Sequence, residues 1–532
     1  MFWVDEIVKD ILEKIPKNDY LITDWMTPSG HAHIGSLRGL ILHDLIRRGL
    51  EEKGKKSVFQ FGFDDFDPMD GLPIYVDQSW QKYMGLPLYK VPAPDGKSKS
   101  FADQYLNEVI EVINGLGIKA KFVRDSELHK EGKYDKVIRT VLDNAPIIRK
   151  IYLEISGSDK GPDWFPLQAV CPKCGKIGTT KVTGWNGKTV RFTCEENLVE
   201  WAKGCGYQGE ISPFGGNAKI PWKVAWATRW FVFGTDIEGE GKDHFAAGGS
   251  RDIANRIYKE IFSAKGRSAS GGKKEPPYDI HYEHILVAGK KMSKSKGSGV
   301  TAKDIYDFLP ANILRFLFTR TRAKRAIDFH PEGEMIPLLY DEYDKATALY
   351  IKDPNSDLGR AYYYAKLDSH QMPPEYVLRF SKVAHLANGG FKLNPEQYAA
   401  EEKGSELSIV EAEELQNRIE IAQKWLNLYA PESYRFSIAS NFIPEPAKNL
   451  SDKQKEFLNK IADIMKTKEN WTGEELHPKI HEIRKAMNIN PRDAFSAIYL
   501  SFIGKDSGPQ AGWVLASLER EFVIRRLGEV IK

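Results

Sequence analysis

Residues 19–63 constrain the fold more than any other part of the sequence. The apolar run Asp19–Thr23 has the composition of a buried strand, and a glycine-containing turn follows it. Apolar residues then recur at helical spacing over Gly35–Arg48, and Lys56–Phe63 has the pattern of a second strand. Strand, turn, helix and strand in this order open a Rossmann-like, doubly wound parallel sheet, in which ligands bind beyond the carboxyl ends of the strands. The sequence therefore predicts an α/β fold.

The length of the chain requires more than one domain. At 532 residues it exceeds what one core supports, so roughly three or four domains are expected. Strand patterns are absent after about residue 335, where helical patterns such as Glu411–Trp425 take over. We predict two halves of a catalytic sheet domain at 1–155 and 223–334, a cysteine-bearing insertion at 156–222, and an all-α region at 335–532.

The net charge of the chain is small, one segment is basic, and no segment is apolar enough to span a membrane. The net charge is 76 − 73 = +3, which by itself does not indicate a nucleic-acid partner. Residues 265–330 hold 14 Lys or Arg against 6 Asp or Glu, a surplus of 14 − 6 = 8. That surplus fits either a polyanion-binding surface or a solvated basic loop. The sequence shows no leader peptide and no run of about 18 apolar residues, so we expect a cytoplasmic protein without a membrane partner.

All four cysteines fall within a short stretch of the predicted insertion. Cys171 and Cys174 form a Cys-x-x-Cys pair followed by glycine, and Cys194 and Cys205 follow at a less regular spacing. Four thiolates are a common tetrahedral ligand set for Zn²⁺, and a cytoplasmic chain keeps its thiols reduced. Two disulfides or four unrelated thiols are the alternatives. We predict a structural zinc site, with no open position for catalysis.

The turn after the first strand carries residues suited to a triphosphate. Gly30 and Gly35 allow close approach of the backbone, and the following helix presents its N-terminus to anions. His33 can donate a hydrogen bond to phosphate oxygens, although a lone His-x-Gly is usually a surface turn. The predicted ATP-binding residues here are Thr27, Pro28, Ser29, Gly30, His33, Gly35 and Ser36, with His33 and Ser36 also predicted to act in catalysis.

A lysine and serine loop follows the strand pattern at 282–288. Its sequence, Lys290–Gly297, reads Lys-Lys-Met-Ser-Lys-Ser-Lys-Gly. Lysines on a glycine-flanked loop can close over pyrophosphate as it leaves with extra negative charge. The alternative is a basic, solvated loop. The predicted ATP-binding residues on this loop are Lys291, Met292, Ser293 and Lys294, and both of these lysines are predicted to be catalytic.

Taken together and in this order, these motifs resemble those of class I lysyl-tRNA synthetases. The resemblance runs from about residue 20 to the end of the chain and includes the cysteine insertion. Further segments that resemble the family are Asp64-Asp65, Gly241–His244, Gly248–Ile253, Ala326–Phe329 and Gly504–Pro509. The resemblance implies ATP with Mg²⁺, structural Zn²⁺, L-lysine, and the acceptor end and anticodon of tRNA(Lys), not DNA. It also implies formation of lysyl-adenylate, then transfer to the 2′-hydroxyl of the terminal adenosine.

Two positions depart from the family pattern. The last residue of the first motif is usually His in class I enzymes and often Asn in the lysyl family, whereas Ser36 stands here. Many members have Ser-Gly just before the turn, whereas this chain has Asp24-Trp25. An aspartate can pair with the substrate ammonium, and an aromatic face attracts a cation.

A lysine pocket needs negative charge at its far end. Asp64 and Asp65 follow a strand end, which favours a site role, although they could instead cap a helix. The tryptophans nearby fit a wall of the pocket or an ordinary core. The predicted amino-acid-binding residues are Asp24, Asp64, Asp65, Trp230, Asp243 and His244. No Ser-His-Asp or activated-cysteine arrangement is visible, and none is needed, because the substrate carboxylate is the nucleophile.

The helical region is less informative by residue. Trp425, Tyr429, Tyr434 and Arg435 could contact unpaired anticodon bases, or could pack between helices, which is the more favoured interpretation. Two other functions remain open: a class I synthetase for another amino acid such as glutamate, and a non-charging paralogue that binds RNA. A glutamate pocket would need arginine, and Arg38 lies near the first motif.

Overall fold

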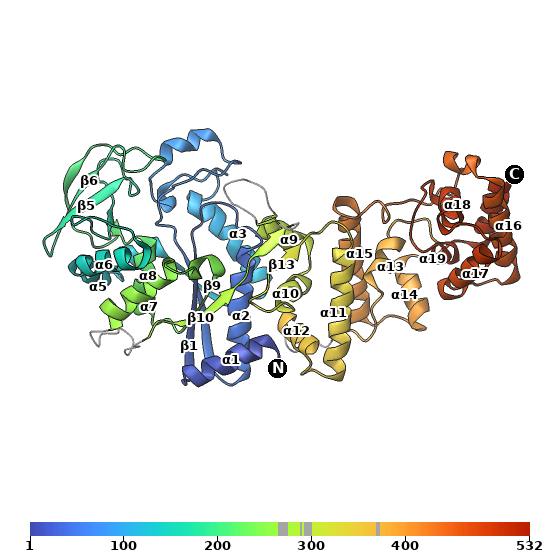
Figure 1. Cartoon of the computed structure of the whole chain (residues 1–532), viewed down its shortest axis with the longest axis horizontal. Helices are drawn as coiled ribbons and strands as arrows, with labels where there is room; N and C mark the ends of the chain where they lie inside the picture. The colour runs from blue at the N-terminus through green and yellow to red at the C-terminus, as the bar shows by residue number, and fades with distance from the viewer. Residues whose placement is uncertain (264–274, 288–289, 292–299, 369–372) are drawn as a thin grey trace. The chain divides into compact units, whose positions relative to one another are not determined.

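The computed structural model of the chain describes residues 1–263, 275–287, 290–291, 300–368 and 373–532. It contains two compact units (Figure 1). The first unit comprises Met1–Phe329 and Leu349–Ser369, and the second comprises His330–Ala348 and His370–Lys532. The four-part division drawn from the sequence stays a prediction.

A five-stranded sheet, parallel throughout, organises the first unit. Its strands are β1 (Asp19–Met26), β2 (Lys56–Phe63), β3 (Ala120–Arg124), β9 (Ile237–Gly241) and β10 (Tyr278–Tyr282). They lie in the order β10-β9-β1-β2-β3, so the winding reverses between β1 and β9. Ligands of doubly wound sheets bind at the carboxyl ends of the strands beside such a reversal. The α/β fold predicted from residues 19–63 is confirmed.

Helices cover both faces of this sheet (Figure 1). One face carries α2, and the other carries α7 and α8. The main helices of this part are α1 (Trp3–Lys14), α2 (Ser36–Glu52), α3 (Phe101–Gly115), α7 (Trp222–Phe233) and α8 (Ser250–Ile257). Local chemistry sets their ends: Ser100 caps the start of α3 through the Asp103 N–H, and Gly234 ends α7 with a left-handed backbone.

The chain between β3 and α7 forms three helices and two small antiparallel sheets. The helices are α4 (Asp125–Lys130), α5 (Asp135–Asp143) and α6 (Ala145–Ser156). The sheets pair β5 (Thr180–Trp185), β6 (Val190–Cys194) and β7 (Gln208–Ile211), and separately β4 (Gln168–Ala169) with β8 (Ala218–Lys219). One apolar core joins these elements to α7 and α8, with Val141, Phe192 and Trp230 among its buried members.

A second small sheet leads to and from the lysine loop. It contains β11 (Ile285–Val287), β12 (Lys290–Lys291) and β13 (Ile327–Phe329). The pattern at 282–288 is therefore split, because β10 ends at Tyr282 in the large sheet and β11 begins a new one. The helices α9 (Ala302–Phe308), α10 (Ala311–Thr319) and α12 (Asp357–Ala365) complete this unit.

The second unit is helical throughout the part that the structure describes. After α11 (Met335–Lys352), which begins in this unit, its helices are α13 (Phe380–Leu386), α14 (Pro395–Lys403), α15 (Ile409–Leu428), α16 (Asp452–Thr467), α17 (Gly473–Ala486), α18 (Pro491–Ile503), α19 (Ala511–Ala516) and α20 (Arg520–Ile531). Capping boxes begin α14 to α17, which explains why their starts are sharply defined. The predicted helix at Glu411–Trp425 is confirmed as part of α15.

Within the described ranges, no helix has the length and apolar composition that crossing a membrane requires.

Candidate active site

The first motif forms the connection between β1 and α2. Thr27 Oγ1 donates a hydrogen bond of 2.7 Å to Asp67, and the Ser29 N–H donates to the Thr27 carbonyl at 2.9 Å. Gly30 has a φ of +154°, and a Cβ there would lie 2.7 Å from the Tyr75 hydroxyl oxygen. Position 30 therefore requires glycine, because the Tyr75 hydroxyl occupies the space that a side chain would take. All seven predicted residues, Thr27, Pro28, Ser29, Gly30, His33, Gly35 and Ser36, lie on this connection or at the start of α2.

The imidazole of His33 lies directly over Gly35. A Cβ at Gly35 would be 2.6 Å from the ring atoms Cε1 and Nδ1, so only glycine fits beneath this histidine. Ser36 is the first residue of α2, and its N–H donates to the His33 carbonyl at 2.9 Å. The positive end of the α2 dipole therefore lies beside His33.

The chain that follows the lysine loop pairs with the first motif. The Ile34 N–H donates to the Val300 carbonyl at 3.1 Å, and the Ala302 N–H donates to the Ala32 carbonyl at 2.7 Å. These bonds anchor residues 300–302 beside His33. Lys291 belongs to β12 by its backbone, whereas its side chain and the residues Met292, Ser293 and Lys294 lie outside the described residues. The described chain that follows the loop, residues 300–302, therefore lies beside the first motif.

Three carboxylates lie near the point where the winding of the sheet reverses, with the Asp24 side chain on the face that carries α2 and the Glu238 side chain on the face that carries α7 and α8. Asp24 comes from β1, and Glu238 and Glu240 come from β9. We call these three residues the open cluster. Glu238 is 1% exposed and accepts 2.7 Å hydrogen bonds from Arg251 and from the Trp226 indole. Of the described cations, only Arg251 forms an ion pair with a member of the open cluster.

Burial raises the pKa of Glu240 well above its usual range, and the nearby charges of Asp24 and Glu238 raise it further. The imidazole of His244 lies 4.0 Å from Glu240, and burial lowers the pKa of this histidine. The raised pKa of Glu240 reflects burial and neighbouring negative charge, whereas the lowered pKa of His244 reflects burial.

The imidazole of His43, on α2, lies beside the Asp24 carboxylate. His43 Nδ1 lies 3.3 Å from Asp24 Oδ2, while His43 Nε2 accepts a 2.7 Å hydrogen bond from the Gly239 N–H. Because Nε2 accepts, the proton of the neutral ring belongs on Nδ1, facing the aspartate. Gly39 leaves room for this arrangement, since a Cβ there would lie 3.0 Å from Asp24 Oδ2 and 2.8 Å from the Tyr282 hydroxyl oxygen.

Aromatic rings line the open cluster. The Trp230 indole also donates to Glu238 at 2.7 Å and is 1% exposed, and Trp226 stacks loosely between Trp222 and Trp230. His244 contacts the edges of Trp222 and Trp226 at ring centroid distances of 5.7 and 5.4 Å. Trp230 is therefore both a core residue and a hydrogen-bond partner of the open cluster.

The glutamates of β9 were missed by the sequence analysis. Central parallel strands are usually continuous apolar runs, so the alternating acids in Ile237–Gly241 were the available signal. Pairing of Thr23 with Glu238 across the sheet brings this strand beside Asp24.

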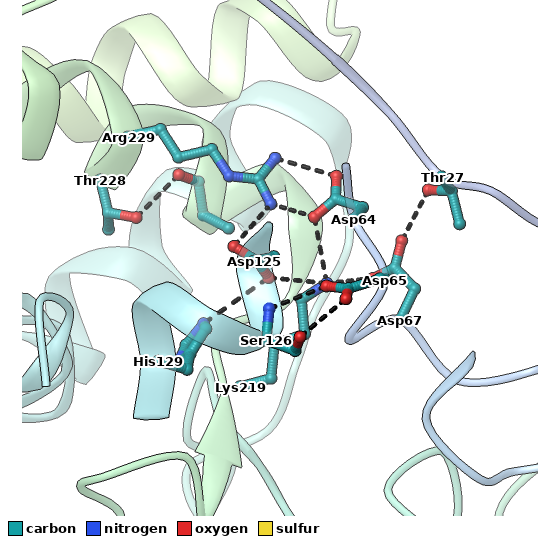
Figure 2. A network of polar contacts seen from close by, with 11 residues as sticks. Thr27, Asp64, Asp65, Asp67, Asp125, Ser126, His129, Lys219, Thr228 and Arg229 are labelled. Carbon is teal, nitrogen blue, oxygen red and sulfur yellow. Dashed lines mark hydrogen bonds and ion pairs between the residues drawn. The ribbon is translucent and has the colours of Figure 1, made fainter. Parts of the chain in front are cut away.

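A second group of carboxylates lies beyond the carboxyl ends of β2 and β3 (Figure 2). Arg229 forms an ion pair with Asp64, and Lys219 Nζ lies 3.3 Å from the same carboxylate. Asp125 lies 3.4 Å from each of these two cations, and Asp67 also pairs with Lys219. We call the full set the neutralised cluster: the carboxylates Asp64, Asp65, Asp67 and Asp125, and the cations Arg124, Lys219 and Arg229.

Asp65 is the most enclosed member of the neutralised cluster. It is 0% exposed and accepts hydrogen bonds from the Ser126 N–H at 2.8 Å, the Ser126 hydroxyl at 2.7 Å and Arg124 Nε at 2.9 Å. Asp64 and Asp65, both predicted to bind the amino acid, thus already have cationic partners. Asp243, predicted for the same role, lies 3.0 Å from His284 Nε2 on a side chain that is 55% exposed.

Trp25 lies beside Arg229 on the opposite face of β1 from Asp24. The guanidinium is 3.9 Å from the centroid of the indole ring, a cation–π contact. The ring also covers Gly62, where a Cβ would lie 2.2 Å from Trp25 Cε3. The departure at position 25 is therefore accommodated by the neighbouring strand.

The four cysteines form one compact group. Their sulfur atoms all lie within 4.8 Å of one another, with Cys171 Sγ 3.6 Å from Cys205 Sγ and Cys174 Sγ 3.7 Å from Cys194 Sγ. These distances exclude disulfides, which need about 2 Å. They match the roughly 3.8 Å between sulfurs that share a tetrahedral Zn²⁺ at about 2.3 Å. The residues present therefore fit a zinc ion.

Comparison with known proteins settles the family. A family model described as "tRNA synthetases class I (K)" matches residues 1–367, and one described as "Anticodon binding domain" matches residues 396–531. The chain belongs to the class I tRNA synthetases. Relatives named lysine--tRNA ligase include proteins of Methanosarcina barkeri (33% identity, 99% of this chain and 97% of the relative) and Thermoplasma volcanium (32% identity, 100% of this chain and 99% of the relative). Lysine--tRNA ligase 1 of Methanosarcina acetivorans is 33% identical over 99% of this chain and 98% of that protein.

The family resemblance and the enzyme class predicted from the motifs are confirmed: this class I synthetase is a ligase. Synthetases of this family use ATP with Mg²⁺. The helical unit contains the part that matches the anticodon-binding domain.

In this synthetase the aromatic residues predicted for anticodon contact are partly core residues. Trp425 is 0% exposed, and its indole donates to the Pro331 carbonyl at 3.1 Å. Tyr434 stacks on His385 at 5.0 Å and lines a cavity of about 430 Å³ together with Arg379 and Trp513. Trp425 therefore packs between helices, whereas Tyr434 is accessible from a cavity.

Proposed function

We propose that this chain is a lysine--tRNA ligase in which the open cluster binds the ε-ammonium group of L-lysine. The observation that carries the proposal is the charge of that site: of Asp24, Glu238 and Glu240, only Glu238 pairs with an arginine or lysine among the described residues. A buried carboxylate without a cation is costly, and it either takes up a proton or gains a cationic partner. A lysine side chain supplies that partner.

The walls of the site suit the rest of the lysine side chain. The indole rings of Trp222 and Trp226 and the imidazole of His244 offer apolar faces to the methylene groups. His43 lies beside the Asp24 carboxylate, with Nδ1 3.3 Å from Oδ2, and its Nε2 accepts the Gly239 N–H. Among the residues named from the sequence, we retain Asp24, Trp230 and His244 in the amino-acid site. We assign Asp64 and Asp65 to the neutralised cluster, and we place Asp243 at its rim.

The first motif is proposed to hold ATP. The N-terminus of α2 offers a positive dipole end to the phosphates, and the imidazole of His33 lies beside it over Gly35. The lysine carboxylate attacks the α-phosphorus, the bond to the β,γ-phosphates breaks, and lysyl-adenylate and pyrophosphate result. We propose that Lys291 and Lys294 stabilise the departing pyrophosphate. The adenylate then loses AMP as the 2′-hydroxyl of the terminal tRNA adenosine takes the lysyl group.

Arg38 disfavours a glutamate substrate. Its guanidinium is buried and donates to carbonyl groups of the segment after α10, including that of Arg322 at 2.8 Å. The arginine nearest to the first motif is therefore engaged in holding α2 to this segment. Three carboxylates in the open cluster would also repel a glutamate side chain.

We propose that the four cysteines hold a structural Zn²⁺. Thr179 Oγ1 lies 3.3 Å from Cys194 Sγ, and the Cys205 N–H donates to the same sulfur at 3.4 Å. Such secondary contacts orient thiolate ligands. With four sulfur ligands the ion has no position for substrate, so it stabilises the fold.

The helical unit is proposed to bind the anticodon of tRNA(Lys). The cavity beside Tyr434 combines aromatic faces with Arg379 and Gln510, the kinds of group that stack on and bond to unpaired bases.

Amino-acid-dependent ATP–pyrophosphate exchange tests the function. Each of the twenty amino acids is supplied with and without total tRNA. Exchange with lysine alone supports the proposal, and exchange with another amino acid would overturn the substrate but keep the mechanism. No exchange under either condition would indicate a non-charging paralogue.

A further inference from the structure

The four-cysteine group and the first motif are far apart in sequence but touch the same stretch of chain. We call residues 64–90, which follow β2, the bridging segment. This segment folds back on itself: the Met69 N–H donates to the Leu86 carbonyl at 2.8 Å, and the Gly85 N–H donates to the Met69 carbonyl at 2.9 Å. The Leu88 N–H likewise donates to the Asp67 carbonyl at 2.9 Å. The two ends of the segment are therefore held together as one strap.

We call residues 168–219, from β4 to β8, the cysteine module. One side of the bridging segment contacts this module. Directly after Cys174, the Ile177 and Gly178 N–H groups both donate to the Gly85 carbonyl, at 2.8 and 3.2 Å. Ile177, at 0% exposed, also packs against Phe66 in a small apolar cluster. The position of Ile177 depends on the Cys171–Lys176 turn, whose Cys171 N–H donates to the Lys176 carbonyl at 2.9 Å.

The other side of the bridging segment contacts the turn of the first motif. Asp67 accepts the hydrogen bond of Thr27 Oγ1 at 2.7 Å. The Tyr75 hydroxyl accepts the His31 N–H at 2.8 Å and occupies the space beside Gly30. Two separate side chains of the segment thus hold the two ends of the turn from Thr27 to His31.

A second connection runs through the neutralised cluster (Figure 2). Lys219 lies on β8, which pairs with β4 immediately before Cys171. Its ammonium group is 1% exposed and forms an ion pair with Asp67, the residue that accepts from Thr27. The cysteine module therefore reaches Asp67 both through the backbone of the bridging segment and through a lysine side chain.

We propose that the cysteine module positions the Thr27–His31 turn through the bridging segment, so that the affinity for ATP depends on the integrity of this module. The inference rests on the proposed assignment of ATP to the turn. Ile177, Tyr75 and Lys219 are then positioning residues, since none of them belongs to the turn itself. The proposed amino-acid pocket takes its carboxylates from β1, before the turn, and from β9, so this connection concerns ATP and not lysine.

The test uses the full-length, zinc-replete enzyme and three variants. Ile177→Ala weakens the contact between module and segment, Tyr75→Phe removes the acceptor for the His31 N–H, and the double variant combines them. Lys181→Met is the matched control, because Lys181 lies in the same module on an exposed side chain and pairs only distantly with Glu195, at 4.0 Å. Zinc content, amide hydrogen exchange of residues 27–31, and the KM values for ATP and lysine are measured for each.

We expect Ile177→Ala and Tyr75→Phe each to raise the KM for ATP about tenfold and to speed exchange at residues 27–31, with the KM for lysine within about twofold. In the double variant, the KM for ATP should rise by less than the product of the two single effects, because both changes act on one connection. Ile177→Ala with unaltered exchange and unaltered KM for ATP would overturn the proposal. Faster exchange with an unaltered KM for ATP would overturn the assignment of ATP to the turn. Zinc removal by a chelator should reproduce the exchange pattern of Ile177→Ala.

Discussion

The open cluster and the neutralised cluster occupy the same edge of one sheet, but they differ in how their charge is balanced. In the neutralised cluster, each of the four carboxylates pairs with at least one of Arg124, Lys219 and Arg229, although Arg124 also pairs with Asp103. In the open cluster, only Glu238 pairs with an arginine or lysine among the described residues, namely Arg251, which also pairs with Asp279. Every carboxylate of the first set already has a cationic partner, and we propose that this set stabilises the fold. We propose that a cation from the substrate completes the second set.

The largest expected effect on stability comes from removing a cation of the neutralised cluster. Arg229→Met leaves Asp64 and Asp125 buried without the guanidinium that they share. Loss of one partner of a buried ion pair costs about 3–5 kcal/mol, so we expect the free energy of unfolding in urea to fall by about that amount. The control is Arg256→Met, which breaks solvent-exposed pairs with Glu260 and Glu154 and should leave the free energy of unfolding nearly unchanged. Equal losses for the two variants would contradict the comparison.

Removing a carboxylate from the open cluster should impair lysine activation without lowering stability. Glu240→Gln takes away a carboxylate that we propose to pair with the substrate ammonium, so kcat/KM for lysine should fall about 100-fold. The free energy of unfolding should stay the same or rise, because a buried carboxylate without a cation is lost. Glu283→Gln, at an exposed pair with Lys242, is the control for exchange assays. Unimpaired lysine activation by Glu240→Gln would remove this residue from the pocket.

The raised pKa of Glu240 gives the open cluster a pH dependence. Lysine binds the ionised carboxylate, so its affinity should rise, by about tenfold, as pH increases through this raised pKa. Without lysine, the sign for stability is reversed: the folded state binds the extra proton, so stability falls as pH rises from about 4 through the same pKa. Isothermal titration calorimetry in buffers of different ionisation enthalpy should detect proton release on lysine binding. Glu240→Gln should abolish that release, and its persistence in the variant would contradict the assignment.

The smallest expected effect comes from removing one hydrogen bond to Asp65 in the neutralised cluster. Ser126→Ala removes the hydroxyl that donates to Asp65 at 2.7 Å but keeps the backbone N–H bond and Arg124. We expect a loss of about 1 kcal/mol in the free energy of unfolding. The KM for lysine should be unaltered, as measured by pyrophosphate exchange. A raised KM for lysine would instead place Asp65 in the amino-acid site.

Local patterns made the sheet and the cysteine group predictable. The strand, turn and helix of residues 19–52 depend on apolar spacing and on glycines that are visible in the sequence. The convergence of Cys171, Cys174, Cys194 and Cys205 follows from their clustering in a short stretch. Such features need little knowledge of the tertiary structure.

The composition of the two clusters was not predictable in the same way. Asp64 looked available because its partners are distant in sequence: Lys219 lies at the end of the insertion and Arg229 lies on α7. Glu238 joins Asp24 only because β9 pairs with β1 at the reversal of the winding. Strand order decides which carboxylates have a cationic partner, and the sequence alone does not reveal it.

The contact between Trp25 and Gly62 restricts the order in which these two positions can change. The indole occupies the space that any side chain at position 62 would need, with a Cβ there only 2.2 Å from the ring. Alanine at position 62 would be tolerated only after the ring at position 25 had been replaced by something smaller, because overpacking a buried contact is destabilising. In a lineage of this enzyme, tryptophan at 25 is therefore accessible only where glycine already stands at 62, and it then makes that glycine hard to lose.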